Sequence, residues 1–208
     1  MILGKYNKQF VFNYLSLFFT IIGMYFLAHT LDLKTSIICY TLVGFTTLLN
    51  TMMSKVLKNN SDDLFRMLLS SFIDIISFVV FPIFVGLFMG FTKWYHFISY
   101  VLFALAGIER ITCFTIKIIE KKDKKNSKFI NGLSNYSMVI TLPLIYLISK
   151  ILTNLDISRD SFEILYTLLI YISSLLFVLN INIVKPNRKI YTVFSIISVI
   201  LFILICIL

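Results

Sequence analysis

The chain has 208 residues, 59% of them hydrophobic, and a formal net charge of +9. A soluble domain of this length has too much polar surface to be built from such a composition, so the sequence predicts an integral membrane protein. In such a protein the excess of Lys and Arg indicates cytoplasmic loops and contact with membrane lipids, and not binding to nucleic acid. The three cysteines show no spacing typical of a metal site or a disulfide.

Long apolar segments recur along the whole chain, each near the roughly 20 residues that a helix needs to cross the hydrocarbon core. The sequence therefore predicts an all-α, polytopic bundle of about seven transmembrane helices within one domain, residues 1–208. The helices are expected at 10–30, 35–54, 64–91, 94–118, 130–152, 161–184 and 189–208. Pro82 and Pro143 fall inside two of these helices and are expected to kink them.

Basic residues are unevenly distributed between the two sides that seven helices define. The N-terminus and the connections after the second, fourth and sixth helices carry 14 Lys and Arg, whereas the opposite side carries 4. This asymmetry predicts a protein of the cell membrane with its N-terminus in the cytoplasm and its C-terminus outside. His29 and His96 then fall near the outer interface, where both are expected to be solvated and not to act as ligands.

Three ionisable residues lie well inside the expected helices: Asp74, Glu109 and Arg110. Each is costly at bilayer depth and is expected to face the bundle interior or a water-filled cavity. At about 1.5 Å per residue, Asp74 and Arg110 reach a similar depth in the cytoplasmic half. Arg110 is therefore the expected partner of Asp74, either in an ion pair that only fixes helix register or as part of a substrate path.

Further polar side chains lie near this depth on the second and third helices. Thr47 and Asn50 are three residues apart and share one helix face, and Ser70 and Asp74 are four apart and share another. Taken alone, hydroxyl residues in membrane helices usually serve packing. Together, the two helices present paired polar positions at corresponding depths, which favours a polar site there.

Four segments carry a resemblance to a known family. They are FNYLSLFFTIIG (12–23), SSFIDIISFVVFP (70–82), GIERITCF (107–114) and FINGLS (129–134). In this order and spacing the chain resembles the CDP-alcohol phosphatidyltransferases, and among them most the bacterial and archaeal phosphatidylserine synthases. The resemblance covers nearly the whole chain, although each segment by itself is a weak match.

The resemblance implies a fold and an activity. The family core has six helices around a polar cavity open to the cytoplasm, which implies such a core over 1–184 and an extra C-terminal helix over 189–208. The implied reaction transfers a phosphatidyl group from CDP-diacylglycerol to a small alcohol, with serine as the best match, in phospholipid synthesis. The implied cofactor is Mg²⁺ or Mn²⁺, and family analogy implies a homodimer or a membrane partner subunit.

The family signature, D-x-x-D-G-x-x-A-R followed by G-x-x-x-D-x-x-x-D, is degenerate here. Its first three carboxylates, which help to hold two divalent ions in the family, fall at Thr47, Asn50 and Ser70, and its arginine falls at Lys55. Only the fourth carboxylate, the proposed base of the family, is intact, as Asp74. Because Mg²⁺ prefers charged oxygens in strict geometry, this set of residues impairs the ordinary two-metal mechanism.

Carried over position by position, the resemblance implies that Asp74 is the general base. It leaves Asp74, Asn50 and Ser70 as residual metal positions, and Lys55, Arg110 and Asn50 as substrate-binding residues. Two interpretations stay open: a diverged transferase, or a catalytically silenced relative that needs no metal and binds a lipid, a nucleotide or another membrane subunit. A small transporter is disfavoured because the polar residues cluster in one leaflet and form no path across.

Overall fold

The computed structural model of the chain describes residues 10–56, 63–119, 129–131, 137–154, 159–179, 182–184 and 188–207. Its helices are α1 (Phe10–Thr30), α2 (Leu33–Val56), α3 (Asp63–Ile75), the π-helix η1 (Ile76–Val80), α4 (Phe81–Phe88), α5 (Trp94–Ile119), α6 (Met138–Asn154), α7 (Arg159–Val178) and α8 (Arg188–Ile207). Two short strands, β1 (Phe129–Asn131) and β2 (Asn182–Val184), complete the described part. Because α3, η1 and α4 succeed one another without a break, the described residues form seven helical segments, as predicted.

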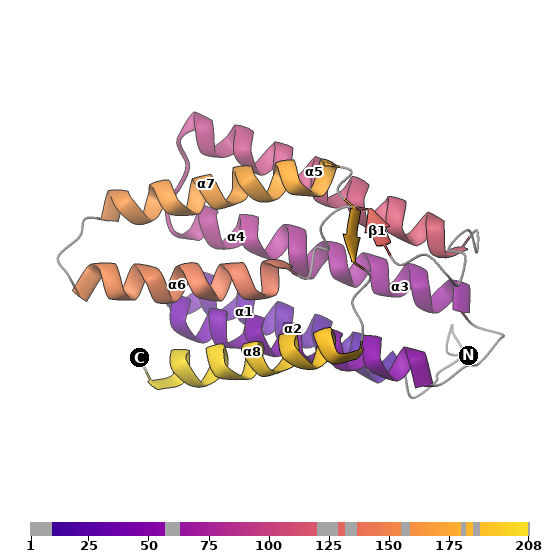
Figure 1. The fold of residues 1–208 in the computed structure, drawn as a ribbon. Helices are drawn as coiled ribbons and strands as arrows, with labels where there is room; N and C mark the ends of the chain where they lie inside the picture. The colour runs from indigo at the N-terminus through magenta and orange to yellow at the C-terminus, as the bar shows by residue number, and fades with distance from the viewer. Residues whose placement is uncertain are drawn as a thin grey trace.

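The helices lie side by side along roughly one direction (Figure 1). α1 packs on α2, α2 on α8 and α5 on α7, while α6 contacts α2, α7 and α8 and so joins the two halves of the bundle. Four segments are long and apolar enough to cross a membrane: Phe10–Thr30, Leu33–Met52, Leu64–Phe88 and Trp94–Ile116. Three shorter apolar helices accompany them: Met138–Ile151, Glu163–Val178 and Thr192–Ile207. The predicted all-α polytopic bundle is confirmed.

The two faces of α1 show how the bundle sorts its side chains. The buried face consists mostly of small and polar residues, among them Asn13, Ser16, Thr20 and Gly23. The exposed face consists largely of large apolar residues, among them Val11, Phe18, Ile21 and Tyr25. This distribution is the reverse of that in a soluble amphipathic helix, and it fits a helix whose outer face meets lipid and whose inner face meets other helices.

Two glycines allow helices to approach each other closely. A Cβ atom on Gly44 of α2 would lie 1.9 Å from Cγ1 of Val139 in α6, and one on Gly107 of α5 would lie 2.7 Å from Cγ2 of Val79 in η1. Valine in a helix has one strongly preferred rotamer, so neither neighbour could easily turn away. Glycine at these positions is therefore what permits the α2–α6 and η1–α5 contacts.

The π-helix η1 lies directly before Pro82. Proline has no N–H to donate to the carbonyl four residues before it, and its ring clashes with that carbonyl, so a regular helix cannot pass through this point unchanged. The helix widens there instead, and the N–H of Phe81 donates to the carbonyl of Ile76, five residues back. The widened turn buries three consecutive residues, 77–79.

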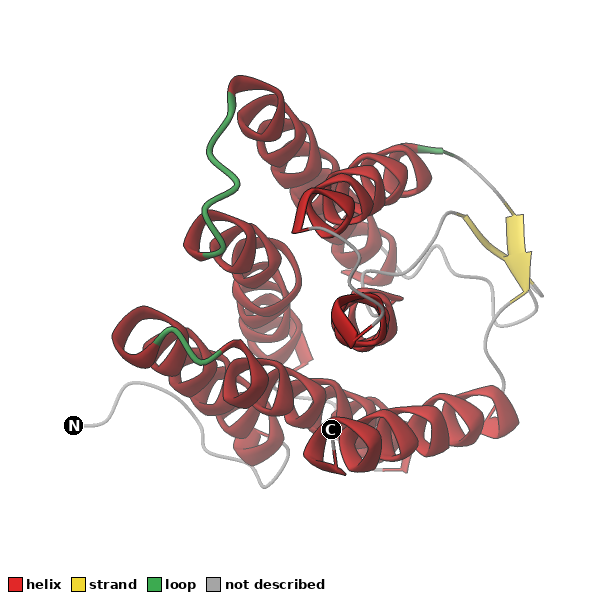
Figure 2. Cartoon of the chain, turned by 90° about the vertical axis from the view of Figure 1, so that its left-hand side faces the viewer, coloured by secondary structure: helices red, strands yellow, loops and turns green. Residues whose placement is uncertain are grey.

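Two predicted helix boundaries are wrong. The sequence predicts the fifth helix at 130–152 and the sixth at 161–184, but α6 begins at Met138 and α7 ends at Val178. Residues 129–131 and 182–184 instead pair as antiparallel strands, with Ile130 opposite Ile183. These strands lie at the edge of the bundle, outside the helices (Figure 2). β-branched residues favour strands wherever a second strand is available to pair with, and that partner lies far away in sequence.

The pairing of β1 with β2 brings the connection after α5 next to the connection after α7. At the opposite end of the bundle, Nζ of Lys34 at the start of α2 lies 3.4 Å from the carbonyl oxygen of Cys206 near the end of α8. Figure 1 shows that α1 begins at the first of these ends and that α8 finishes at the other. We call the end at which α1 begins and β1 pairs with β2 the basic end, because most of the Lys and Arg in the sequence fall before α1 and after α2, α5 and α7.

Candidate functional site

Asn50, a predicted site residue of the second helix, contacts the first helix. The side-chain amide of Asn50 in α2 donates from Nδ2 to Oδ1 of Asn13 in α1. Asn13 is only 3% exposed. It is not one of the predicted site residues, although it lies within the first segment of the family resemblance. The partner of Asn50 is therefore a neutral amide on the first helix.

Thr47, the other predicted polar position on this helix, is buried and bonds to its own helix. Its side chain is buried, and its hydroxyl lies within hydrogen-bond distance of two carbonyls of its own helix, those of Val43 (3.0 Å) and Gly44 (2.8 Å). A threonine hydroxyl that bonds back to its own helix satisfies itself locally. Lys55 lies in the last turn of α2, and its side chain is outside the described residues.

The third-helix positions, Ser70 and Asp74, are both half-buried on α3. Ser71 beside them lies 2.6 Å, hydroxyl to hydroxyl, from Thr115 of α5, and further along the same helix pair Val79 packs against Gly107. These two contacts fix the continuous segment α3–η1 and α5 as antiparallel neighbours in a constant register.

That register bears on the predicted ion pair. Asp74 is three residues after Ser71, and Arg110 precedes Thr115 by five, so the two charged residues occupy nearly the same level. Arg110 is half-buried, whereas Glu109 is exposed. Asp74 and Arg110 each interact with at least one other residue of the chain. The packing of α3 on α5 thus brings the two residues to corresponding depths, and their direct pairing stays a prediction.

The predicted metal positions do not fit a site for divalent cations. Within the described residues, no three His, Cys, Asp or Glu side chains come together as a metal-binding group. Asp74 supplies one carboxylate, whereas the amide of Asn50 bonds to Asn13 and the hydroxyl of Thr47 bonds to its own helix. Mg²⁺ and Mn²⁺ favour several charged oxygens. The donors at these positions are therefore too few and too neutral for the two-metal arrangement of the family.

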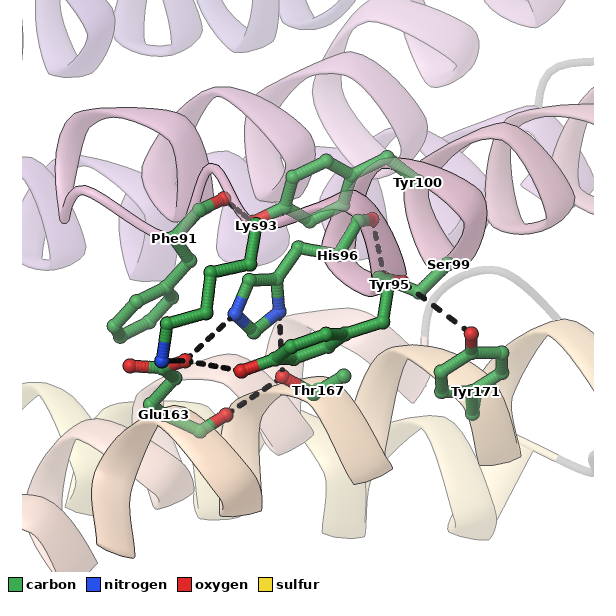
Figure 3. Close-up of polar contacts among 9 residues, drawn as sticks. All are labelled: Phe91, Lys93, Tyr95, His96, Ser99, Tyr100, Glu163, Thr167 and Tyr171. Atoms are coloured by element: carbon green, nitrogen blue, oxygen red, sulfur yellow. Dashed lines mark hydrogen bonds and ion pairs between the residues drawn. The ribbon is translucent and has the colours of Figure 1, made fainter. Parts of the chain in front are cut away.

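A second polar cluster, not predicted from the sequence, joins the beginning of α5 to α7 (Figure 3). Figure 1 shows that α5 begins at the end of the bundle opposite the basic end. Oε1 of Glu163 in α7 accepts hydrogen bonds from Nζ of Lys93 (2.7 Å), from the hydroxyl of Tyr95 (2.7 Å) and from Nε2 of His96 (2.9 Å). A carboxylate can only accept, so Nε2 of His96 carries a proton. Nδ1 of the same ring lies 2.9 Å from the hydroxyl of Thr167, one turn after Glu163.

The expectation that His96 is solvated is wrong. His96 is only 1% exposed, because Phe91, Tyr95 and Tyr100 pack around its ring. A buried imidazole needs partners for both ring nitrogens, and Glu163 and Thr167 are placed to supply them. The other histidine, His29, is exposed as expected.

The ion pair between Lys93 and Glu163 shifts the pKa of Lys93, which lies in the α4–α5 loop. The hydrogen bond to Glu163, and then that to Tyr95, raises the pKa of the Lys93 ammonium above its usual range. Lys93 is more than half exposed, so solvent screens the pair and its contribution to stability is modest. The cluster lacks a free nucleophile beside a base, and its polar groups are used on one another. Its geometry suits a structural link that holds the beginning of α5 against the first turns of α7.

We predict that Asp74 and Arg110 stabilise each other. Asp74→Ala alone should lower the free energy of unfolding more than Asp74→Ala combined with Arg110→Leu, because the single change leaves a half-buried cation within the bundle without its carboxylate. Breaking a buried pair typically costs about 3–5 kcal/mol. Unfolding in detergent by denaturant or heat measures the difference, with Glu109→Ala at the exposed neighbour as control. Equal loss in the single and double variants would show that the two residues are not partners.

We also predict that Glu163 carries the cluster between α5 and α7. Glu163→Ala should lower the melting temperature, since it strands the buried Nε2–H of His96, and an unsatisfied buried donor costs about 1–3 kcal/mol. Glu163→Leu combined with His96→Phe removes both partners and should recover part of the loss. Thermal unfolding measures both, with Glu109→Leu as the matched control. A double variant no better than Glu163→Ala would contradict this account.

Comparisons of the chain with protein-family profiles, with curated proteins and with solved structures returned no match. The family resemblance therefore rests on the four segments of the sequence and on the order in which they occur. Any functional assignment depends on those segments and on how the polar residues around Asn50 and Asp74 pack.

Proposed function

We propose that this protein is a phosphatidyltransferase-like membrane protein that binds CDP-diacylglycerol, or a lipid with a similar phosphate headgroup, without performing metal-dependent transfer. The observation that carries the proposal is the hydrogen bond between Asn50 and Asn13. It uses a signature position for helix packing, at a place where the family would need a metal-binding carboxylate. Thr47, bonded to its own helix, supports the same conclusion.

Binding of a phosphate-bearing lipid without catalysis is supported by the basic residues at positions of family resemblance. Lys55 and Arg110, at the positions that resemble the phosphate-binding residues of the family, still carry positive charge. Arg110 is half-buried, and a guanidinium withdrawn from bulk water interacts strongly with phosphate oxygens. The excess of basic residues at the same end of the bundle would also attract an anionic headgroup. These features favour a phosphate-bearing lipid over a neutral one.

Catalytic transfer to a small alcohol such as serine is the second candidate function, because Asp74 is retained. On this alternative Asp74 would accept the proton of the attacking hydroxyl, and Arg110 and Lys55 would hold the phosphates. Asp74 and Ser70 share one face of α3, so the hydroxyl of Ser70 would lie near the attacking group. The donors present do not fit the divalent ions that the family uses, so we rank this function second.

The proposal predicts lipid binding with little turnover. Purified protein in nanodiscs should bind CDP-diacylglycerol in the presence of EDTA, and serine-dependent release of CMP should stay near background with Mg²⁺ or Mn²⁺. Each lost contribution of about 1.36 kcal/mol lowers the rate tenfold, so missing metal ligands leave very little activity. Arg110→Leu should weaken binding, whereas Lys150→Met, in α6 toward the other end of the bundle, should not. Failure to bind would refute the lipid-binding proposal, and robust CMP release would put the transferase first.

Restoring the signature tests the same proposal from the other direction. Thr47→Asp, Asn50→Asp, Thr51→Gly and Ser70→Asp made together should recover binding of Mn²⁺, which is measured by electron paramagnetic resonance. No single reversion should suffice, because two ions need several ligands at once. Recovery of transfer could require Lys55→Arg in addition, since lysine is the poorer bidentate partner of phosphate. Binding of Mn²⁺ by the unmodified protein would contradict the proposal that the chain does not bind divalent metal ions at these positions.

We propose further that the basic end lies in the cytoplasm, with the N-terminus inside and the C-terminus outside. The distribution of Lys and Arg supports this orientation. Single cysteines at Asn126 and Ser158, in a background that lacks the three native cysteines, should react with a membrane-impermeant thiol reagent from opposite sides. In intact cells only the cysteine at position 158 should be labelled. Labelling of both positions from outside would end this topology.

A further inference from the structure

In the part of the chain that the structure describes, the unpaired buried side-chain atoms all lie in one helix pair. Within the described residues, five buried side-chain atoms have no hydrogen-bond partner: Asn13 Nδ2, Ser16 Oγ, Ser36 Oγ, Tyr40 Oη and Asn50 Oδ1. All five belong to α1 or α2. Nearly all buried polar groups in native proteins have a partner, which is either protein or an ordered water molecule. A concentration of exceptions in a single helix interface therefore calls for a common cause.

The five atoms form two groups along the antiparallel α1–α2 pair. Asn13, Ser16 and Asn50 lie in the half toward the basic end, and Ser36 and Tyr40 lie in the other half. A hydrogen bond joins Asn13 to Asn50, and Ser16 lies one turn after Asn13 on the buried face of α1.

The region between the two groups holds paired hydroxyls. The hydroxyl of Thr20 lies 2.8 Å from that of Ser77 in η1, so both are satisfied. The hydroxyl of Thr20 also lies 2.9 Å from the carbonyl oxygen of Ser16. The hydroxyls between the two groups that these contacts describe therefore have partners, and they do not belong to either group of unpaired atoms.

Re-orienting the amides of Asn13 and Asn50 or the ring of Tyr40 does not remove their unpaired atoms. If both amides are turned over, Asn13 donates to Asn50 instead, and each amide still has one group without a partner. The Tyr40 ring stacks on Phe81 at 4.7 Å between centroids, with 9° between planes, which fixes the direction of its hydroxyl. For Asn13, Asn50 and Tyr40, the lack of partners is therefore a property of the interface and not of one chosen side-chain orientation.

We propose that the α1–α2 interface binds water at two separate sites, one bounded by Asn13, Ser16 and Asn50 and the other by Ser36 and Tyr40. The first site offers an amide donor, an amide acceptor and a hydroxyl, and the second offers two hydroxyls. These groups are neutral and mix donors with acceptors, which suits water and neither a cation nor an anion. The inference is independent of the proposed lipid binding.

Other buried tyrosines provide matched controls. Tyr166 is 2% exposed and Tyr40 is 0% exposed, so accessibility does not distinguish them. The hydroxyl of Tyr166 donates to the carbonyl of Pro82, and that of Tyr100 donates to the carbonyl of Phe91. Only the hydroxyl of Tyr40 among these three is unpaired. Bound water should therefore be found beside Tyr40 and not beside Tyr166.

X-ray radiolytic labelling in H₂¹⁸O tests the second site, because bound water generates hydroxyl radicals in place and modifies the side chains that it touches. Tyr40 should incorporate ¹⁸O several-fold faster than Tyr166 and Tyr100 in the same folded sample. Labelling of Tyr40 as slow as that of the two controls would overturn this site.

Thermal unfolding tests both sites. If water completes the hydrogen bonds, Tyr40→Phe and Ser16→Ala should each lower the melting temperature. The control Ser198→Ala removes a buried hydroxyl that only bonds its own helix, to the carbonyl of Phe194, and should have little effect. If the interface is dry, removing an unsatisfied hydroxyl should leave the melting temperature unchanged or raise it. That result for Ser16→Ala would overturn the first site, and for Tyr40→Phe the second.

Discussion

A polar group that lies within a membrane-spanning bundle has no bulk water to bond to, and this constraint organises the whole protein. Hydroxyl and amide side chains are turned inward, where they meet across helix interfaces: Asn13 with Asn50, Thr20 with Ser77, and Ser71 with Thr115. Each of these contacts joins two different helices. Because lipid supplies little hydrophobic force between helices, such contacts and close packing at small residues decide which helices become neighbours.

α5 connects the two polar regions of the bundle. Near its beginning it carries His96, which meets Glu163 of α7, and near its end it carries Thr115, which meets Ser71 of α3. It is one uninterrupted helix of 26 residues, so its position is fixed at both ends. The cluster at the first turn therefore helps to hold Arg110, further along the same helix, at the level of Asp74.

Local patterns were sufficient to predict most of the fold. Runs of apolar residues indicated all seven helical segments, and Pro82 marked the place where the third segment departs from a regular helix. The errors have a common origin in contacts between distant residues. β1 pairs with a strand about fifty residues away, and nothing within residues 129–131 or 182–184 reveals that partner. Sequence alone therefore extended two helices into these strands.

The candidate site shows the same limit. Sequence placed Asp74 and Arg110 at one depth, and the α3–α5 register agrees, but it could not show that Asn50 faces Asn13. For His96 a usable signal existed: Lys93, His96 and Glu163 all fall on the same predicted side of the membrane, at the beginnings of two helices. A histidine and a glutamate at the beginnings of two helices on that side could have been expected to pair.

On the proposed function, the amide pair at Asn13 and Asn50 gives a physical reason why the carboxylates of the signature would be replaced together. Carboxylates that surround two divalent cations are balanced by them, but without the cations they repel one another in a medium of low dielectric constant. On the proposed function, each neutral replacement relieves that repulsion. Once Asn50 bonds to Asn13, the helices can close on each other, and a single restored aspartate would be an isolated buried charge. Loss of metal binding would then be self-reinforcing, because the packing that replaces the metals opposes their return.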